Sequence, residues 1–211
     1  MSKRVAIIGT NAFGKHLFHL IDQYTDDIVI GWYDDFANQN QQIENVNVLG
    51  KIEDINPENF DYLAIAIGYN HLEFKLKLIH QLKAKGISLY NFIHPNSVID
   101  TSTKFGEGII IFPNSVIGKN VSLEDGVVVH NSVTISHDCK IGECTFICPS
   151  VSLAGNVNLG KKCFIGIGSI FTDNVSIVNE STIGAGTLVH HSIENPGTYV
   201  NKRIQTLTKL K

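Results

Sequence analysis

Residues 116–151 read VIGKNV, SLEDGV, VVHNSV, TISHDC, KIGECT and FICPSV when they are cut into groups of six. The same frame runs without an insertion from Val98 to Ile193, which makes sixteen hexads. The second position of every hexad is Ile, Leu, Val or Phe, the third is often Gly, and the sixth is mostly Val, Cys, Ser or Thr. A period of six over this length predicts a repeat architecture for the second half of the chain.

The period has a specific physical meaning. One aliphatic side chain per hexad points inward, a small residue lies beside it, and a turn follows at which Gly or Asn is favourable. Three hexads close one triangular coil, and successive coils stack at the strand spacing of about 4.8 Å. The sixteen hexads therefore predict a parallel β-helix, a three-sided prism of about five coils, whose handedness the spacing does not fix.

The first part of the chain follows a different pattern, in which short apolar strands alternate with amphipathic helices. We expect strands at residues 4–9, 28–35, 62–68 and 88–94, and helices at residues 12–24 and 70–86. This alternation predicts a parallel sheet with right-handed crossovers. The expected fold is thus an α/β Rossmann-like domain at residues 1–92, followed by the β-helix domain and a C-terminal tail at residues 93–211.

The composition excludes several classes of protein. The chain has 211 residues, of which 43% are hydrophobic and 18% charged, so it can build a core. Its formal net charge of -3 gives no reason to expect nucleic acid or a membrane as a partner. We find no long apolar run and no signal peptide, and we expect a cytoplasmic protein. The cysteine spacing fits neither a zinc site nor a redox pair, so we expect no bound metal and four buried thiols: Cys139, Cys144, Cys148 and Cys163.

Three further motifs are IHPNSVI (93–99), SHDCKIG (136–142) and LAGNVNLG (153–160). Through them the whole chain resembles the bacterial sugar acyltransferases. These include the N-acetyltransferase of bacillosamine synthesis, its relatives acting on other nucleotide-linked 4-amino sugars, and the sialic acid O-acetyltransferases. The resemblance covers Arg4 to about Pro196. It implies a left-handed prism, acetyl-CoA as co-substrate, and a homotrimer with active sites in the grooves between neighbouring chains.

The resemblance assigns roles to His137 and Asp138. It implies that His137 is the general base and that the adjacent acid orients its imidazole. A group with a pKa near 6.5 suits the proton that an amine loses as it attacks a thioester, and a neighbouring carboxylate fixes the tautomer. No Cys or Ser stands beside a base as a covalent nucleophile would, so we expect direct transfer. Two alternatives stay open: His137 is a solvated turn residue, or Glu143 is its partner.

The resemblance also indicates where the coenzyme lies. The Gly155 amide is expected to face the thioester carbonyl, while small residues of later coils lie along the pantetheine. Phe146 stands where several relatives have histidine, and the tail lacks the family's Gly-x-Pro-Ala-Lys loop. The Phe146 departure leaves open which group donates to the thioester carbonyl, and the changed tail leaves its own role open. The two basic residues of the tail could contact the coenzyme or could be solvated only. The expected coenzyme contacts are Gly155, Ile165, Gly166, Ala185, Gly186, Lys202 and Arg203.

The stretch GTNAFGKH (9–16) lies between an expected strand and helix. It departs from the P-loop because His16 replaces the Mg²⁺-binding hydroxyl, and from the dinucleotide motif because Asn11 replaces the middle glycine. What stays is a tight turn whose amides can hold an anion, and the resemblance implies that it holds a UDP- or dTDP-sugar. Alternatively, the glycines only allow a close turn and the acids are ordinary loop residues. The expected substrate contacts are Gly9, Asn11, Gly14, Asp34, Asp35, Gly68 and Asn70.

Together these features favour an enzyme, an acetyl-CoA-dependent N-acetyltransferase of a nucleotide-linked 4-amino-4,6-dideoxy sugar. The product is expected to enter a surface polysaccharide or glycan, such as the O-antigen of lipopolysaccharide. The sequence does not separate uracil from thymine, nor one position or configuration of the amine from another. Two other functions stay open, O-acetylation of a sugar such as sialic acid and a non-catalytic trimeric scaffold.

Overall fold

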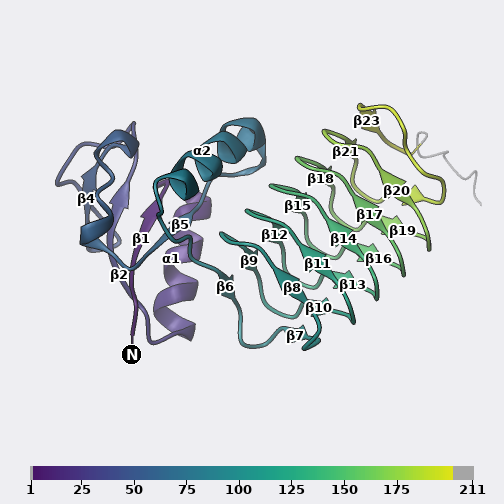
Figure 1. Ribbon diagram of the computed structural model, residues 1–211, viewed down its shortest axis with the longest axis horizontal. Coiled ribbons are helices and arrows are strands. Elements are labelled where there is room, and N and C mark those ends of the chain that lie inside the picture. The colour runs from purple at the N-terminus through teal and green to yellow at the C-terminus, as the bar shows by residue number, and fades with distance from the viewer. Residues whose placement is uncertain (1, 202–211) are drawn as a thin grey trace, which may run out of the picture.

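The computed structural model describes residues 2–201, which form a small sheet domain followed by a long prism (Figure 1). The sheet has the order β3-β4-β2-β1-β5 and is parallel except for the β3–β4 pair. The domain contains β1 (Arg4–Ile8), α1 (Ala12–Tyr24), β2 (Ile28–Tyr33), β3 (Gln42–Ile43), β4 (Val46–Gly50), β5 (Tyr62–Ile65), α2 (Leu72–Ala84) and three short 3-10 helices, η1 (Ile52–Asp54), η2 (Pro57–Asn59) and η3 (Tyr69–His71). The Rossmann-like α/β domain is confirmed, and β3 and β4 are strands that we did not expect.

The two helices cover opposite faces of the sheet. Val5 and Ile7 of β1 share a core cluster with the buried residues of α1, whereas Ala6 and Ile8 share another with those of α2. This alternation follows from the period of two along a strand. Within residues 2–201, neither helix has the length and apolar character needed to cross a membrane.

The prism is a left-handed parallel β-helix with three faces (Figure 1). The first face contains β7 (Val98–Ile99), β10 (Val116–Ile117), β13 (Thr134–Ile135), β16 (Ser152–Leu153), β19 (Ile170–Phe171) and β22 (Leu188–Val189). The second contains β8 (Lys104–Phe105), β11 (Ser122–Leu123), β14 (Lys140–Ile141), β17 (Asn158–Leu159) and β20 (Ser176–Ile177). The third contains β6 (Phe92–Ile93), β9 (Ile110–Ile111), β12 (Val128–Val129), β15 (Phe146–Ile147), β18 (Phe164–Ile165), β21 (Thr182–Ile183) and β23 (Thr198–Tyr199).

Except for β21 and β23, neighbouring strands on a face pair eighteen residues apart, as Val116 with Thr134 and Ile117 with Ile135. The second residue of each hexad points inward, and these aliphatic side chains form one continuous buried core. We call the edge between the first and second faces the first edge, that between the second and third faces the second edge, and that between the third and first faces the third edge.

The segment expected as a last sheet strand, residues 88–94, does not form one. Leu89 makes a single bridge to Leu63 of β5, and β6 (Phe92–Ile93) pairs with β9 of the prism instead. The expected domain boundary after residue 92 thus falls within the first prism strand. An alternating apolar segment reads alike in both settings, so the sequence pattern could not separate them.

The turns of the prism share one backbone conformation. The fifth hexad position has a positive φ in fourteen consecutive turns, from Gly108 to Gly186. Four of these positions are glycine, and the others include Asn114, Asn120 and Asp138. Asn and Asp tolerate the left-handed conformation better than most residues do, which explains their recurrence at this position.

The sheet domain packs against the third face and the second edge. Phe13 of α1 lies 6.0 Å, between ring centroids, from both Phe112 and Phe146. On the other side of the domain, Lys75 of α2 is fully buried and its Nζ donates to the Gly126 carbonyl over 2.8 Å. Burial lowers the pKa of Lys75 to about 8. These contacts make the domain and the prism one packed unit.

Gly126 should tolerate substitution far worse than a glycine of the same conformation elsewhere on the prism. In Gly126→Ala the new methyl group would lie 2.5 Å from Ile79 Cδ1 and 3.0 Å from Cys144 Sγ. Overpacking and left-handed strain should together lower the free energy of unfolding by about 2–4 kcal/mol. Gly168→Ala has a similar φ, 66° against 69°, but meets nothing within 4 Å, so it should lose about 1 kcal/mol. Urea denaturation compares the two, and equal losses would contradict this account of the domain contact.

Candidate functional site

His137 and Asp138 lie on the first edge, in the turn between β13 and β14. The His137 Nδ1 is 2.9 Å from Asp138 Oδ2, and the other carboxylate oxygen accepts a hydrogen bond from Asn120 Nδ2 over 3.1 Å. Both side chains are accessible, with 58% of His137 and 46% of Asp138 exposed. Asn120 belongs to the preceding coil, and sequence reasoning missed it because contacts eighteen residues apart follow from the stacking alone.

The hydrogen bonds indicate the tautomer of His137 and the ionisation of Asp138. Because a carboxylate only accepts, Nδ1 carries a proton in this contact, and in the neutral form of the ring Nε2 is the nitrogen with the lone pair. Hydrogen bonds from His137 and then Asn120 lower the pKa of Asp138, so this carboxylate is ionised. No hydrogen bond joins Nε2 to any of residues 2–201. The arrangement presents an oriented base to solvent.

Gly155 lies one coil further along the same edge, directly beneath the His137 ring. A Cβ added to Gly155 would lie 2.5 Å from His137 Cε1 and 2.6 Å from Nε2, so only glycine leaves room for the imidazole in this position. The Gly155 amide donates to Asp173 Oδ1 over 2.8 Å. This amide is thus engaged by Asp173 in the described chain, and the expectation that it faces an incoming carbonyl stays a prediction.

Glu143, the alternative partner of His137, lies on the second edge. Its carboxylate binds His80 Nε2 over 2.8 Å and also pairs with Lys161. Within the chain it therefore does not contact His137, and this alternative was wrong. The physical reason is that Glu143 comes six residues after His137, and one hexad further along this β-helix is the next edge of the prism.

Phe146 and His130 both lie beneath the sheet domain. The Phe146 ring is 6.0 Å from Phe13 and 5.6 Å from Tyr69, measured between centroids. The His130 ring stacks on Phe112 at 4.2 Å, and burial lowers its pKa. Phe146 thus contributes to packing between the domains, and within one chain it lies on a different face from the His137 edge.

The expected coenzyme contacts are divided between parts of the prism. Ala185 and Gly186 lie exposed on the third edge, opposite the edge of Gly155, and Gly166 is buried nearby with its Cα close to the Ala185 backbone. Ile165 points into the core and is fully buried, so its side chain is not available to a ligand. Lys202 and Arg203 lie outside the described residues.

A cavity of about 580 Å³ opens in the sheet domain at the carboxyl ends of β1, β2 and β5, the usual ligand position in an open α/β sheet. Five of the expected substrate contacts line it: Gly9, Asn11, Asp34, Asp35 and Gly68. Gly14 and Asn70 do not line it. Gly14 instead packs against the Gly9 carbonyl, where a side chain would collide.

Sequence reasoning missed other residues of the cavity wall. Thr10, Phe36, His71 and Phe74 line it, and Phe36 is fully exposed while Phe74 is half exposed. The sequence shows the two aromatic residues, but it does not show that both lie beside the glycine turn, because this depends on the path of the loops. No prism residue lines this cavity.

The side chains of Asn11 and Asp34 at the cavity are already engaged within the domain. Asn11 is the N-cap of α1, and its Oδ1 accepts from the amides of Phe13 and Gly14. Asp34 Oδ2 accepts from the Thr10 amide and hydroxyl over 2.8 and 2.7 Å. Partial burial opposes ionisation of Asp34, but these bonds and one from the Phe36 amide outweigh it and lower the pKa. The glycine turn is thus held rigidly, with fewer free amides than a bare helix start offers.

Comparisons with known proteins match both parts of the chain. Residues 93–204 match the family described as the GMPPB C-terminal domain, and residues 4–81 match the one described as the PglD N-terminal domain. A search of curated proteins gave no significant match. No group of three His, Cys, Asp or Glu side chains within residues 2–201 has the geometry of a metal site.

Three solved structures share the architecture over nearly the whole chain. The acetyltransferase domain of PglB from Neisseria gonorrhoeae, in complex with acetyl coenzyme A, has a TM-score of 0.86 at 26% identity and covers 98% of this chain and 100% of that chain. PerB from Caulobacter crescentus, in complex with CoA and GDP-perosamine, has a TM-score of 0.75 at 21% identity, with 95% and 97% covered. WeeI from Acinetobacter baumannii has a TM-score of 0.60 at 18% identity, with 93% and 96% covered. At their identities, the latter two show the fold alone.

The Asp34 contacts predict a pH-dependent stability. Asp34→Ala removes three accepted hydrogen bonds and should lower the free energy of unfolding by about 1–2 kcal/mol at pH 7. Because the pKa of Asp34 is lowered in the folded state, this stabilisation is complete above the ordinary value of 3.8 and is lost as the pH falls through the folded value. The difference between wild type and variant in urea denaturation should therefore shrink below about pH 4.

Asp35→Ala is the matched control for this variant. Asp35 accepts one bond, from the Ile52 amide over 2.9 Å, so its loss should be smaller. A difference between Asp34→Ala and wild type that did not change with pH would contradict the argument.

Proposed function

We propose that the chain acetylates the amino group of a nucleotide-linked 4-amino-4,6-dideoxy sugar. It belongs to the GMPPB C-terminal domain family of β-helices. Its N-terminal domain and its fold place it among the bacterial nucleotide-sugar acetyltransferases. The acetyl donor is acetyl-CoA, the ligand of the PglB domain. The observation that carries the proposal is the His137–Asp138 pair, which holds a free Nε2 over Gly155 on an exposed prism edge.

In the proposed reaction the amine attacks the thioester carbonyl directly. The new C–N bond forms while Nε2 of His137 accepts a proton from the amine, and the C–S bond then breaks as the proton passes to the departing thiolate. The carboxylate of Asp138 stabilises the imidazolium that exists between these steps. Asn120 holds Asp138 in the orientation that this role needs.

The cavity of the sheet domain is proposed to hold the nucleotide. Gly9, Asn11 and Gly68 line the cavity, and Gly68, where an added Cβ would meet nothing within 4 Å, lets a phosphate approach the backbone. The rings of Phe36 and Phe74 offer apolar surfaces to a base. Asp34 and Asp35 shape the cavity by fixing its loops. We keep UDP and dTDP as the expected nucleotides and add GDP, because PerB was solved with GDP-perosamine.

A homotrimer is proposed as the active form. The first face carries outward aliphatic side chains that are 43–64% exposed: Val98, Val116, Ile170 and Leu188. If this face surrounds a threefold axis, the first edge of one copy lies beside the third edge of the next. The Gly155 edge and the small residues Gly166, Ala185 and Gly186 would then meet, and acetyl-CoA could lie between copies. The coenzyme fits this surface because an added Cβ on Gly186 meets nothing within 4 Å, which leaves room for a pantetheine chain.

The resemblance supports the wider setting of this reaction. Nucleotide sugars and acetyl-CoA are cytoplasmic metabolites, so we place the reaction in the cytoplasm and its product in the assembly of a surface polysaccharide such as O-antigen. O-acetylation and a non-catalytic scaffold are the two competing functions.

Coenzyme A release in the presence of acetyl-CoA tests the function. The acceptors are UDP- and dTDP-4-amino-4,6-dideoxyhexoses, GDP-perosamine, the 4-hydroxy counterparts and free sialic acid. We expect turnover with one amine, and His137→Ala should lower kcat by about 10²–10⁴-fold because proton transfer is lost. His19→Ala, in the exposed part of α1, should keep the wild-type rate. Turnover on hydroxyl acceptors alone would indicate O-acetylation, and no turnover or acetyl-CoA binding would favour the scaffold.

Light scattering with size exclusion tests the oligomer. Ile170→Lys places a charge on the first face and should convert the trimer into monomers, because an unpaired charge is not tolerated in a buried interface. Ser176→Lys is the matched control, at the same hexad position on the second face. Equal behaviour of the two variants would show that the first face is not the interface.

A further inference from the structure

Asp173 is a carboxylate whose charge the fold does not require. It lies at the fourth hexad position, and its Oδ1 accepts from the amide of Gly155 one coil earlier. The same contact recurs on the second edge, where Asp125 Oδ1 accepts from the Glu107 amide and Asn179 Oδ1 accepts from the Lys161 amide, each over 2.8 Å. Since an asparagine makes the contact equally well, the fold needs an oxygen at this position and no negative charge.

The charge of Asp173 faces the same place as the free nitrogen of His137. A Cβ added to Gly155 would lie 2.6 Å from His137 Nε2 and 3.2 Å from Asp173 Oδ1. The separation of His137 Nε2 and Asp173 Oδ1 therefore cannot exceed the sum of these two distances. The two side chains do not form an ion pair with each other. A single nitrogen can bind both atoms over about 2.9 Å only if they are no more than about 5.8 Å apart, and they meet this limit. The geometry suits a donor that interacts with a base and a carboxylate together.

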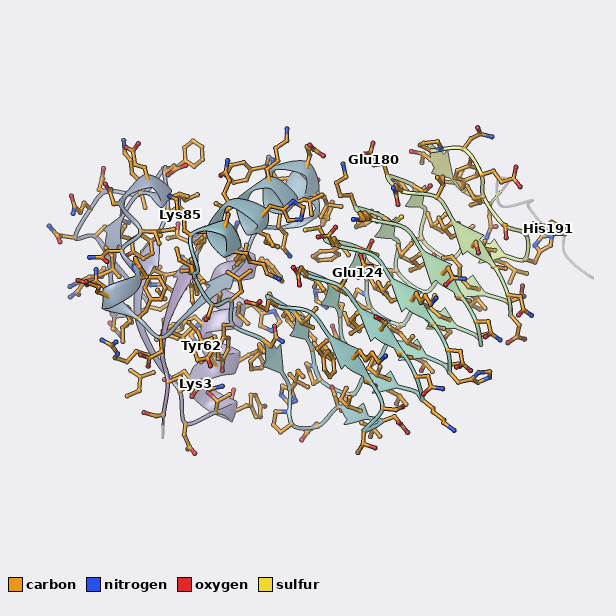
Figure 2. The ribbon with its side chains drawn as sticks, viewed as in Figure 1. Lys3, Tyr62, Lys85, Glu124, Glu180 and His191 are labelled. Carbon is orange, nitrogen blue, oxygen red and sulfur yellow. The ribbon has the colours of Figure 1, made fainter. Side chains whose placement is uncertain are left out.

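The other charged groups along this edge leave Asp173 available. Asp138 pairs with His137, and the charge of Lys119, in the preceding coil, acts on Asp138. His191 is the next residue of the column, one coil beyond Asp173 and near the far end of the prism (Figure 2). No described residue forms an ion pair with Asp173, whose side chain is exposed.

We propose that Asp173 binds the protonated amino group of the acceptor beside His137 and thereby selects amine over hydroxyl acceptors. A sugar amine is largely an ammonium ion near neutral pH, and a hydrogen bond from a cation to a carboxylate is about twice as strong as a neutral one. The ammonium releases one proton to solvent, the amine then forms the C–N bond, and its next proton passes through Nε2 to the thiolate. This inference rests on the proposed function, because it names the selectivity of the same site.

Binding of two ligands that differ at one atom tests the proposal. Calorimetric titration with CoA present compares the amino nucleotide sugar that the wild type acetylates with its 4-hydroxy counterpart. In Asp173→Asn the affinity for the amino ligand should fall at least about tenfold, while that for the hydroxy ligand changes less than about twofold. The melting temperature should not change, because asparagine keeps the contact to Gly155, whereas Asp173→Ala should lower it.

Other outcomes overturn the proposal. Equal losses for both ligands, or none, in Asp173→Asn would leave Asp173 with a structural role only. The wild type gives a second test, since its preference for the amino ligand should decline as the pH rises through the pKa of the bound ligand's amine, and a constant preference would contradict the proposal. A wild type that acetylates no amine at all would refute the proposed function instead, so the two failures are distinguishable.

Discussion

The left-handed turn at the fifth position of each hexad is the constraint on which the rest of the structure depends. Every turn from residue 108 to residue 186 adopts it, although most of these residues are not glycine. Each non-glycine residue in this conformation costs about 1 kcal/mol, and the continuous aliphatic core offsets this strain. Because all turns are alike, the fourth positions stack into straight columns along the edges. His137, Gly155 and Asp173 are brought together by this stacking alone.

The three faces of the prism have become different surfaces. The third face is covered by α1, whose Phe13 packs against Phe112 and Phe146. The second face carries outward lysine and glutamate side chains, such as Lys104, Lys140 and Glu124, and is suited to solvent. Only the first face combines exposed aliphatic side chains with the absence of a covering domain within the described residues. A single scaffold therefore separates the contacts that hold the sheet domain from those available to another chain.

The fold could be predicted from the sequence almost completely, because a period of six has few physical solutions. The exceptions are local: β3 and β4 were not expected, and Phe92–Ile93 could extend either domain. The site was harder to predict from the sequence. The His137–Asp138 contact is between neighbours and followed from adjacency, but Asn120 and Asp173 act from eighteen residues away, and Glu143 belongs to another edge. Such contacts depend on how the coils stack and not on any local motif.

The adjacent residues His137 and Asp138 do not interrupt the regularity of the prism. Asp138 occupies the left-handed position of its turn, with φ 60°, where Asn and Asp are among the residues best tolerated. His137, at the fourth position of this turn, therefore has a carboxylate oxygen next to it, within reach of Nδ1. The turn requirement and the orientation of the base are met by the same residue. Two neighbours distinguish His137 in its column: Asp138, which bonds its Nδ1, and Gly155, which leaves room for its ring one coil further on.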